Sequence, residues 1–194
     1  MLGLMLEVRS RFIELRESST RNAYRTHRSV SRIAAIAEST MLNVVLIEPE
    51  IPPNTGNIGR LCLATGAHLH LVKPLGFSLD DKMLLRAGLD YWSEVKVTLW
   101  DSFEQLLSSC ADRARVFFLT TKSSRPYWDE QFRDGDFLVF GRETKGLPEP
   151  LLAANEGRCL TIPMPGSTRS LNLATAVGIV LYEAVRQIMA RSRV

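Results

Sequence analysis

Short apolar segments rich in β-branched and aromatic residues recur from residue 42 onward, and helical patterns separate several of them. These segments are short, and some of them are uninterrupted by polar residues, which is typical of strands buried on both faces of a parallel sheet. The alternation predicts a single α/β domain in which helices flank a parallel sheet. The predicted strands are Leu42–Ile47, Leu69–Val72, Val95–Leu99, Val116–Leu119, Phe137–Phe140 and Cys159–Ile162. The predicted helices are Ile58–Thr65, Asp80–Ala87, Ser102–Leu107 and Leu171–Met189.

The composition changes at Met41. Residues 1–40 hold seven arginines and four glutamates, which accounts for the whole net charge of +3. Residues 41–194 therefore carry no net charge, and any attraction to a phosphate backbone must come from a local basic patch. We interpret residues 1–40 as an extension that is disordered or outside the fold, with a possible biological start at Met41, and residues 41–194 as the domain. A basic arm and a targeting peptide are the alternatives, although four glutamates argue against a transit peptide.

The cysteine and histidine positions favour a cytoplasmic protein without a metal site. Cys62, Cys110 and Cys159 are far apart and odd in number, so we expect reduced thiols. His68 and His70 lie two residues apart on a predicted strand and point to the same face, which suggests a structural pair. No apolar run approaches the ~20 residues that cross a membrane, so we expect no membrane span.

The loop after the first predicted strand reads EPEIPPNTGNIGR over residues 48–60. Ligands of open α/β sheets bind outside the carboxyl ends of the strands, where this loop lies. Asn54 or Thr55 is a candidate helix cap, and Asn57 and Arg60 would then share one face of the first turn. A helix N-terminus beside an arginine suits a phosphate or another oxyanion. The loop lacks the G-x-G-x-x-G order of a dinucleotide fingerprint, and a purely structural turn is the alternative.

Two further loops follow predicted strands and read GRETKGLP over residues 141–148 and PMPGSTRSLNLA over residues 163–174. The glycines of the first loop allow a tight turn or a close approach to a ligand. The first loop is not a Walker A motif, because Leu147 follows its second glycine. Ser170 and Asn172 are uncharged hydrogen-bonding residues where the long helix starts. They suit a nucleoside or a ribose hydroxyl, and ordinary helix capping is the alternative.

Taken together, five segments resemble the SPOUT class of RNA methyltransferases and, within it, the TrmL-type enzymes that methylate the ribose 2′-oxygen of the tRNA wobble nucleotide. The segments occur in the family's order and cover essentially all of residues 41–190. The resemblance implies a deep trefoil knot near the C-terminus, an exception to unknotted topology that periodicity does not predict. Residues 1–40 have no counterpart in the family core. The matching segments are Leu46–Arg60, Pro74–Phe77, Arg86–Tyr91, Phe140–Pro148 and Ile162–Leu173.

The resemblance also implies a cofactor, S-adenosylmethionine, and the roles of individual residues. Because the methyl group of this cofactor is already activated, the enzyme mainly aligns the 2′-hydroxyl and lowers its proton affinity, and no metal is required. We expect Arg60 beside the 2′-hydroxyl, with Asn57 positioning Arg60 or the ribose. Glu143 would orient Arg60 or the cofactor, and Ser170 and Asn172 would complete the hydrogen-bonding floor. The expected cofactor contacts are Leu119, Thr120, Gly141, Ile162, Met164, Ser170 and Leu171.

The same loops carry a predicted basic patch for RNA, formed by Arg142, Lys145 and Arg169. The resemblance implies that the partner is a tRNA anticodon stem-loop, with leucine isoacceptors as the substrates and position 34 as the target. Three rival functions remain open at this stage. They are methylation of another RNA such as ribosomal RNA, RNA binding without catalysis, and a Rossmann-type nucleotide enzyme.

The long C-terminal helix carries a stripe of small and apolar residues at Ala174, Val177, Leu181 and Val185. Their spacing of three and four residues places them on one helix face, which belongs to the core or to an interface. Family members pair through such helices, so the resemblance implies a homodimer whose tRNA site spans both subunits. We use the stripe as the predicted dimer contact.

Overall fold

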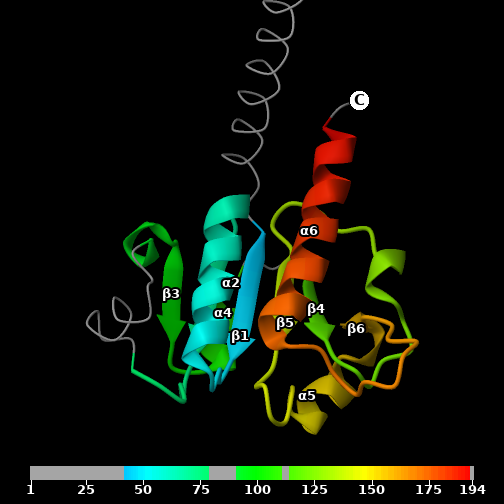
Figure 1. The fold of residues 1–194 in the computed structure, drawn as a ribbon, viewed down its shortest axis with the longest axis horizontal. Coiled ribbons are helices and arrows are strands. Elements are labelled where there is room, and N and C mark those ends of the chain that lie inside the picture. Colours follow the sequence, from blue (N-terminus) through cyan, green and yellow to red (C-terminus); the bar gives the residue numbers. More distant parts are fainter. Residues whose placement is uncertain (1–41, 79–90, 111–113, 193–194) are drawn as a thin grey trace, which may run out of the picture. The chain divides into compact units, whose positions relative to one another are not determined.

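A six-stranded, wholly parallel sheet forms the centre of the fold, with the strand order β3-β2-β1-β5-β4-β6 (Figure 1). The computed structural model describes residues 42–78, 91–110 and 114–192. All six predicted strands are confirmed: β4 and β5 have the predicted bounds, and the ends of the other four differ by one or two residues. The strands are β1 (Asn43–Ile47), β2 (His68–Val72), β3 (Val97–Trp100), β4 (Val116–Leu119), β5 (Phe137–Phe140) and β6 (Cys159–Leu160).

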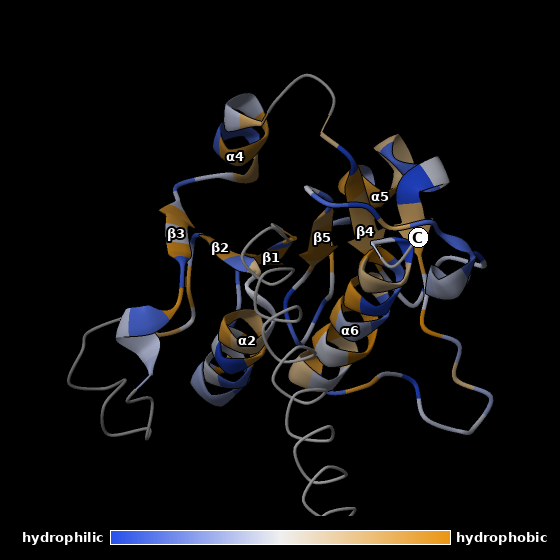
Figure 2. Cartoon of the chain, turned by 90° about the horizontal axis from the view of Figure 1, so that it is seen from above, coloured by the Kyte–Doolittle hydropathy of each residue, from blue (hydrophilic) through white to orange (hydrophobic). Residues whose placement is uncertain are grey.

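In the described part of the chain, α2 and α6 cover one face of the sheet and α4 and α5 cover the other (Figure 2). Residues of β1 alternate between two buried clusters: Val44 and Leu46 belong to the cluster beneath α2 and α6, and Val45 and Ile47 to the one beneath α4 and α5. A strand with four consecutive apolar residues therefore has a layer of helices to pack against on each of its faces. The helices are α2 (Pro52–Thr65), α4 (Phe103–Ser109), α5 (Glu149–Ala154) and α6 (Leu173–Arg191), with 3-10 turns η1 (Trp92–Glu94), η2 (Tyr127–Asp129) and η3 (Glu156–Arg158).

The helices of the structure differ in part from the predicted ones. The predicted helix Asp80–Ala87 lies outside the described residues. Ser102 caps α4 by accepting a hydrogen bond from the Gln105 amide, so this helix begins one residue later than predicted. The short helix α5 was not predicted, because six residues that begin with Glu and Pro show no clear periodicity. The parallel α/β fold is confirmed, and the trefoil knot stays a prediction.

Helix α2 begins six residues earlier than predicted. Pro52 and Pro53 occupy its first two positions, where a missing amide hydrogen leaves no hydrogen bond unmade. The prediction that Asn54 or Thr55 caps the helix is wrong, because the capping position is Ile51 and its side chain makes no capping bond. Asn57 and Arg60 consequently lie beyond the first turn, so the predicted oxyanion site at the helix start does not include Arg60.

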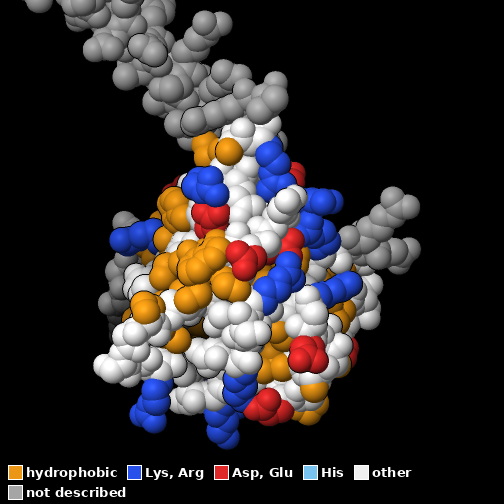
Figure 3. All heavy atoms as spheres, turned by 90° about the vertical axis from the view of Figure 1, so that its right-hand side faces the viewer, with side chains coloured by type: hydrophobic (Ala, Val, Ile, Leu, Met, Phe, Trp, Pro, Cys, Tyr) orange, Lys and Arg blue, Asp and Glu red, His pale blue; other side chains and the backbone are white. Residues whose placement is uncertain are grey.

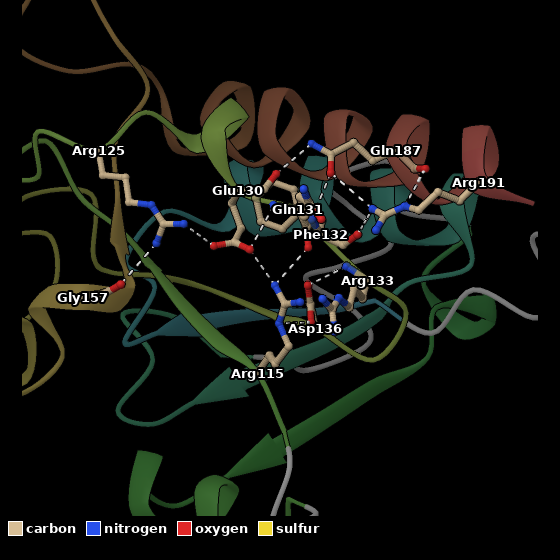
Figure 4. A network of polar contacts seen from close by, with 10 residues as sticks. All are labelled: Arg115, Arg125, Glu130, Gln131, Phe132, Arg133, Asp136, Gly157, Gln187 and Arg191. Atoms are coloured by element: carbon tan, nitrogen blue, oxygen red, sulfur yellow. Dashed lines mark hydrogen bonds and ion pairs between the residues drawn. The ribbon is translucent and has the colours of Figure 1, made fainter.

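Hydrogen bonds and ion pairs of charged and amide side chains hold the segment between β4 and β5 against the sheet and the end of α6 (Figure 4). The carboxylate of Glu130 accepts from Arg115 at 2.7 Å and from Arg125 at 2.6 Å. The amide of Gln187 on α6 donates to the Glu130 carbonyl at 3.0 Å and accepts from the Phe132 amide at 3.0 Å. These bonds pair polar groups of Glu130 and Phe132 in a connection whose described regular structure is the short turn η2, and they hold the connection against the sheet.

The two histidines of β2 form a structural pair, as predicted, with ring centroids 4.2 Å apart. The indole N–H of Trp100 donates to Nδ1 of His70 at 3.0 Å, and Nε2 of His70 lies 3.0 Å from Oδ1 of Asn43. Since indole only donates, Nδ1 must be unprotonated and Nε2 carries the hydrogen. Burial, with a smaller contribution from His68, lowers the pKa of His70 to about 4. Among the described residues, no group of three or more potential metal ligands is found.

We predict that the buried neutral His70 makes stability pH-dependent. A histidine whose folded pKa lies below its unfolded pKa of 6.5 stabilises the fold above pH 6.5, and this contribution is lost as the pH falls toward 4. Replacing His70 with Gln keeps a donor and an acceptor but removes the titration. In urea denaturation at pH 7.5 and pH 4, the stability advantage of the wild type over H70Q should shrink by about 3 kcal/mol.

The stability of the wild type must be compared with that of H70Q at each pH, because Asp136 also titrates between pH 4 and pH 7.5. Burial raises the pKa of Asp136 to about 6, so its own contribution to stability increases as the pH falls from 6 toward 4. This change opposes that of His70 within the wild type, but it is common to wild type and variant and cancels in their difference. An advantage that stays constant with pH would contradict the assigned state of His70.

Helix α6 turns its predicted stripe toward the core. Val177 and Leu181 are 0% exposed, and Ala174 and Val185 pack against the same cluster. The prediction that this stripe is the dimer contact is therefore wrong, because α6 must cover the sheet within its own chain. Among the described residues, α6 is the one helix long and apolar enough, by length and composition alone, to span a membrane. The buried stripe accounts for part of this composition, because its apolar side chains pack against the sheet.

Candidate active site

Loops at the carboxyl ends of β4, β5 and β6, together with the starts of α2 and α6, enclose a cavity of about 510 Å³. This position is the one expected for a ligand in an open α/β sheet, and the volume suits a molecule of nucleoside size. All seven predicted cofactor residues line the cavity, as do Glu143, Asn172, Arg142 and Lys145. The predicted site residues Asn57, Arg60 and Arg169 do not line it. Further lining residues include Ile51, Asn54, Thr121, Lys122, Phe140, Thr144, Gly146, Leu147, Leu173 and Ala176.

The loop after β5 folds back on itself as a narrow hairpin. The Gly146 amide donates to the Arg142 carbonyl at 2.9 Å, and Gly146 has a φ of 66°, which favours glycine. A Cβ at Gly141 would lie 2.1 Å from the carbonyl carbon of Gly146, so the two backbones meet with no room for a side chain. The glycine spacing seen in the sequence therefore reflects close approach of backbone to backbone at the edge of the cavity.

Glu143 joins this hairpin to the start of α2. Its carboxylate accepts from the Glu50 amide at 2.9 Å, from the Ile51 amide at 3.3 Å and from the side-chain amide of Asn54 at 2.9 Å. A carboxylate from a distant loop thus replaces the local cap that α2 lacks, and its negative charge complements the helix dipole. In the single chain both carboxylate oxygens bind the start of α2, so the role of Glu143 in orienting Arg60 or the cofactor stays a prediction.

Asn54 extends the same connection to the third loop. Asn54 is 6% exposed, and its Oδ1 accepts from Nδ2 of Asn172 at 2.9 Å. Oδ1 of Asn172 accepts from the amides of Ala174 and Thr175, which makes Asn172 the cap of α6. Glu143, Asn54 and Asn172 therefore hold all three cavity loops in fixed relative positions. Sequence patterns predict Asn54 only as a local cap, because its actual partners lie 89 and 118 residues away.

The charged residues around the cavity differ in how they are paired. Arg142 forms an ion pair with Glu48, and Lys122 forms one with Glu149. Lys145 and Arg169 are exposed and form no ion pair with another residue in the described part of the chain. Of the three arginine and lysine residues predicted to hold RNA, these two keep their donors available to a phosphate.

A second carboxylate, that of Glu50, joins the loop after β1 to the hairpin after β5. The Glu50 carboxylate accepts from the Thr144 amide at 3.1 Å and from its hydroxyl at 2.7 Å. These bonds, the hydroxyl bond above all, lower the pKa of Glu50. The hairpin thus contacts the first loop twice, through Glu143 and through Thr144. Neither Glu50 nor Thr144 was among the predicted site residues, because exposed side chains in a loop give no pattern in one sequence.

Arg60 lies on the exposed side of α2, two turns beyond the helix start. Its guanidinium carbon is 4.5 Å from the centroid of the Tyr91 ring, within the range of a cation–π contact. Asn57, three residues earlier, is exposed on the same helix. One chain therefore brings together the predicted cofactor contacts but leaves Asn57 and Arg60 outside the cavity.

Comparisons with known proteins identify the family to which the chain belongs. Residues 41–182 match the family model described as the SpoU rRNA Methylase family. The chain belongs to the SpoU methylase family. The predicted SPOUT-class membership is thereby confirmed, and a Rossmann-type nucleotide enzyme is set aside.

Curated relatives of this SpoU methylase are named tRNA (cytidine(34)-2′-O)-methyltransferase. The one from Escherichia coli K12 is 49% identical over 149 residues, covering 76% of this chain and 94% of the relative. The one from Burkholderia cenocepacia is 51% identical over 152 residues, covering 76% and 96%. The matched region thus spans nearly the whole length of these relatives.

Solved structures resemble this SpoU methylase over the same region. A structure from work on the 2-OH methylation of C/U34 on tRNA is 49% identical, with a TM-score of 0.74, covering 79% of this chain and 99% of the other. AviRb from Streptomyces viridochromogenes, in complex with the cofactor AdoMet, is 26% identical, with a TM-score of 0.67 over 77% of this chain and 58% of AviRb. A structural relative in the family therefore binds S-adenosylmethionine.

Proposed function

We propose that this SpoU methylase transfers a methyl group from S-adenosylmethionine to the ribose 2′-oxygen of wobble nucleotide 34 in tRNA, on cytidine or a modified uridine. The observation that carries the proposal is the cavity at the carboxyl ends of β4, β5 and β6, which all seven expected cofactor residues line. About 50% identity to tRNA (cytidine(34)-2′-O)-methyltransferases over nearly their full length supports the substrate. Leucine isoacceptors and a cytoplasmic location are further parts of the proposal.

The residues present fit S-adenosylmethionine by their chemistry. Leu119, Ile162 and Leu171 supply apolar walls for an adenine ring, and the hairpin from Gly141 offers backbone groups that approach closely because it carries no side chain there. The bound cofactor supplies an activated methyl group. Glu143, Asn54 and Asn172 keep the three loops in register, so that the pocket does not have to be ordered when its ligand arrives.

RNA recognition and catalysis use residues of the cavity loops together with residues that lie outside the cavity. Lys145 and Arg169, whose donors are not held by carboxylates of the described chain, attract the phosphates of an anticodon stem-loop. Arg142 joins them when a phosphate displaces Glu48. Arg60 then contacts the nucleotide at its phosphate or 2′-hydroxyl, lowering the proton affinity of the attacking oxygen through its positive charge. Asn57 and Ser170 orient the ribose.

We propose that the protein works as a homodimer paired through the outward face of α6. Thr175, Ile179, Tyr182 and Arg186 follow one another at helical spacing on the side opposite the buried stripe. Only 22% of the apolar window of α6 is buried within the chain, and Tyr182 is 49% exposed. Figure 3 shows hydrophobic side chains gathered among Lys and Arg side chains on the side of the molecule to which α6 belongs.

The dimer proposal predicts the effect of a charge at Tyr182. Tyr182→Glu would place an unpaired carboxylate in the interface and should weaken self-association by more than about 100-fold, with loss of tRNA methylation. The melting temperature of the monomer should change little, because this side chain is exposed in the single chain. Leu107→Glu is the matched control, since Leu107 is 40% exposed on α4, across the sheet. Sedimentation of Y182E as a dimer at micromolar concentration would contradict this interface.

We also propose that residues 41–194 form the functional domain without residues 1–40. The family model begins at Met41, and the sheet begins at Asn43. A variant that starts at Met41 should keep the cofactor affinity and the melting temperature of the full chain. Isothermal titration with S-adenosylmethionine and a thermal melt measure both. Loss of soluble folding in the shortened protein would refute this division.

The proposed function is tested by labelled methyl transfer. Purified protein is incubated with S-adenosylmethionine that carries a labelled methyl group and with total tRNA, and 2′-O-methyl positions are then mapped. Label at nucleotide 34 of tRNA is the expected result. Because the matched family is named for rRNA methylation, ribosomal RNA is the parallel substrate. Label on ribosomal RNA alone would overturn the tRNA assignment, and no label on either RNA would overturn the methyltransferase proposal.

A further inference from the structure

The segment Tyr91–Trp92 packs directly against the backbone of α2. The Tyr91 hydroxyl donates to the Gly56 carbonyl at 2.9 Å. A Cβ at Gly59 would lie 2.6 Å from Cζ3 of Trp92, so the indole ring occupies the space that a side chain would need. The missing side chain of Gly59 thus leaves room for the Trp92 ring, and the Gly56 carbonyl, about one turn earlier in α2, accepts the hydrogen bond from Tyr91. The rings also pack against the main buried cluster, which fixes them relative to the sheet.

The guanidinium of Arg60 lies over the face of the Tyr91 ring. The guanidinium carbon lies 4.5 Å from the ring centroid, and Arg60 is exposed. Within the described residues, Arg60 forms no ion pair. Stacking on the ring face restrains the long side chain and leaves the N–H groups at its edge available to a ligand. Arg142 shows the contrast, because its ion pair with Glu48 engages the donors themselves.

We propose that Tyr91 is a positioning residue for Arg60: its ring holds the guanidinium at the surface of α2, with its donors directed to the RNA. This inference rests on the proposed role of Arg60 in methyl transfer. A carboxylate in the place of Tyr91 would fix Arg60 equally well but would compete with the phosphate for the same N–H groups. An aromatic ring supports the cation without consuming its donors, so the side chain is ordered before the nucleotide arrives.

Two substitutions separate the ring from the hydroxyl. Tyr91→Phe removes the bond to the Gly56 carbonyl and keeps the ring, and Tyr91→Leu removes both but keeps apolar bulk over α2. We expect Tyr91→Phe to retain kcat within about 2-fold, and Tyr91→Leu to lower kcat about 10-fold. The Kd for S-adenosylmethionine should stay within about 2-fold in both variants, because Tyr91 does not line the cavity. A loss of kcat in Tyr91→Phe equal to that in Tyr91→Leu would overturn the proposal.

A double-mutant cycle tests whether Tyr91 acts through Arg60. Single-turnover methylation is measured with excess enzyme for Tyr91→Leu, Arg60→Ala and the double variant. In the Arg60→Ala background, Tyr91→Leu should change the rate by less than about 2-fold. A further 10-fold loss there would show a structural role independent of Arg60 and would overturn the inference while leaving the proposed function intact. If the wild type methylates another RNA instead of tRNA, the tRNA assignment fails, and the cycle run on that RNA still decides the role of Tyr91.

Discussion

Replacing Arg60 with Ala is expected to reduce methyl transfer to tRNA by about 1,000-fold or more, which corresponds to about 4 kcal/mol of lost transition-state stabilisation. Arg60 projects from the exposed side of α2, with its guanidinium on the Tyr91 ring and no ion pair to another described residue. Removing it takes away the positive charge proposed to lie beside the attacking oxygen. Because Arg60 does not line the cavity, the Kd for S-adenosylmethionine should stay within about 2-fold.

Single-turnover kinetics and isothermal titration separate these two effects. Arg158→Ala is the matched control, because Arg158 is an exposed arginine just before β6, at the opposite end of that strand from the cavity loops. The control should retain turnover within about 2-fold. Near-normal turnover in Arg60→Ala would exclude Arg60 from catalysis, whereas a loss of cofactor binding would show that α2 contributes to the pocket beyond Asn54.

Replacing Gly141 with Ala is expected to weaken cofactor binding by about 100-fold or more. The new methyl group would lie 2.1 Å from the carbonyl carbon of Gly146 and 2.3 Å from the amide nitrogen of Leu147. Both neighbours are backbone atoms of a closed hairpin, so the hairpin must open to admit the methyl group. Opening it displaces Glu143, which binds the start of α2, and thereby disturbs two of the three cavity loops.

The control for this substitution is Gly157→Ala, where an added Cβ would meet no atom within 4 Å. Isothermal titration with S-adenosylmethionine should distinguish the two variants, and a thermal melt should show a lower stability for Gly141→Ala alone. Equal cofactor affinity in both variants would mean that the hairpin widens without consequence for the pocket. The close approach at Gly141 would then have no role in binding.

The apolar stripe of α6 shows what a periodic pattern can predict and what it cannot. The spacing of Ala174, Val177, Leu181 and Val185 identified one apolar face, but a pattern does not say what covers that face. In the structure Val177 and Leu181 are fully buried against the sheet of their own chain. The surface available to a partner is the opposite side, with Tyr182, where Thr and Arg interrupt the apolar residues and weaken the pattern.

The sequence by itself determined the strands, the parallel sheet and the loops that enclose the cavity, because strand burial and turn residues leave local patterns. It also carried the family resemblance, which named the seven expected cofactor contacts that the structure then brings together in one cavity. Only the tertiary structure decided that Glu143 caps α2, that Asn54 joins Glu143 to Asn172, and that Arg60 rests on Tyr91. Each of these contacts links residues between 31 and 118 positions apart in the chain. A hydrogen bond or a cation–π contact depends on distances set by the packing of the whole domain, so no local pattern in the sequence encodes it.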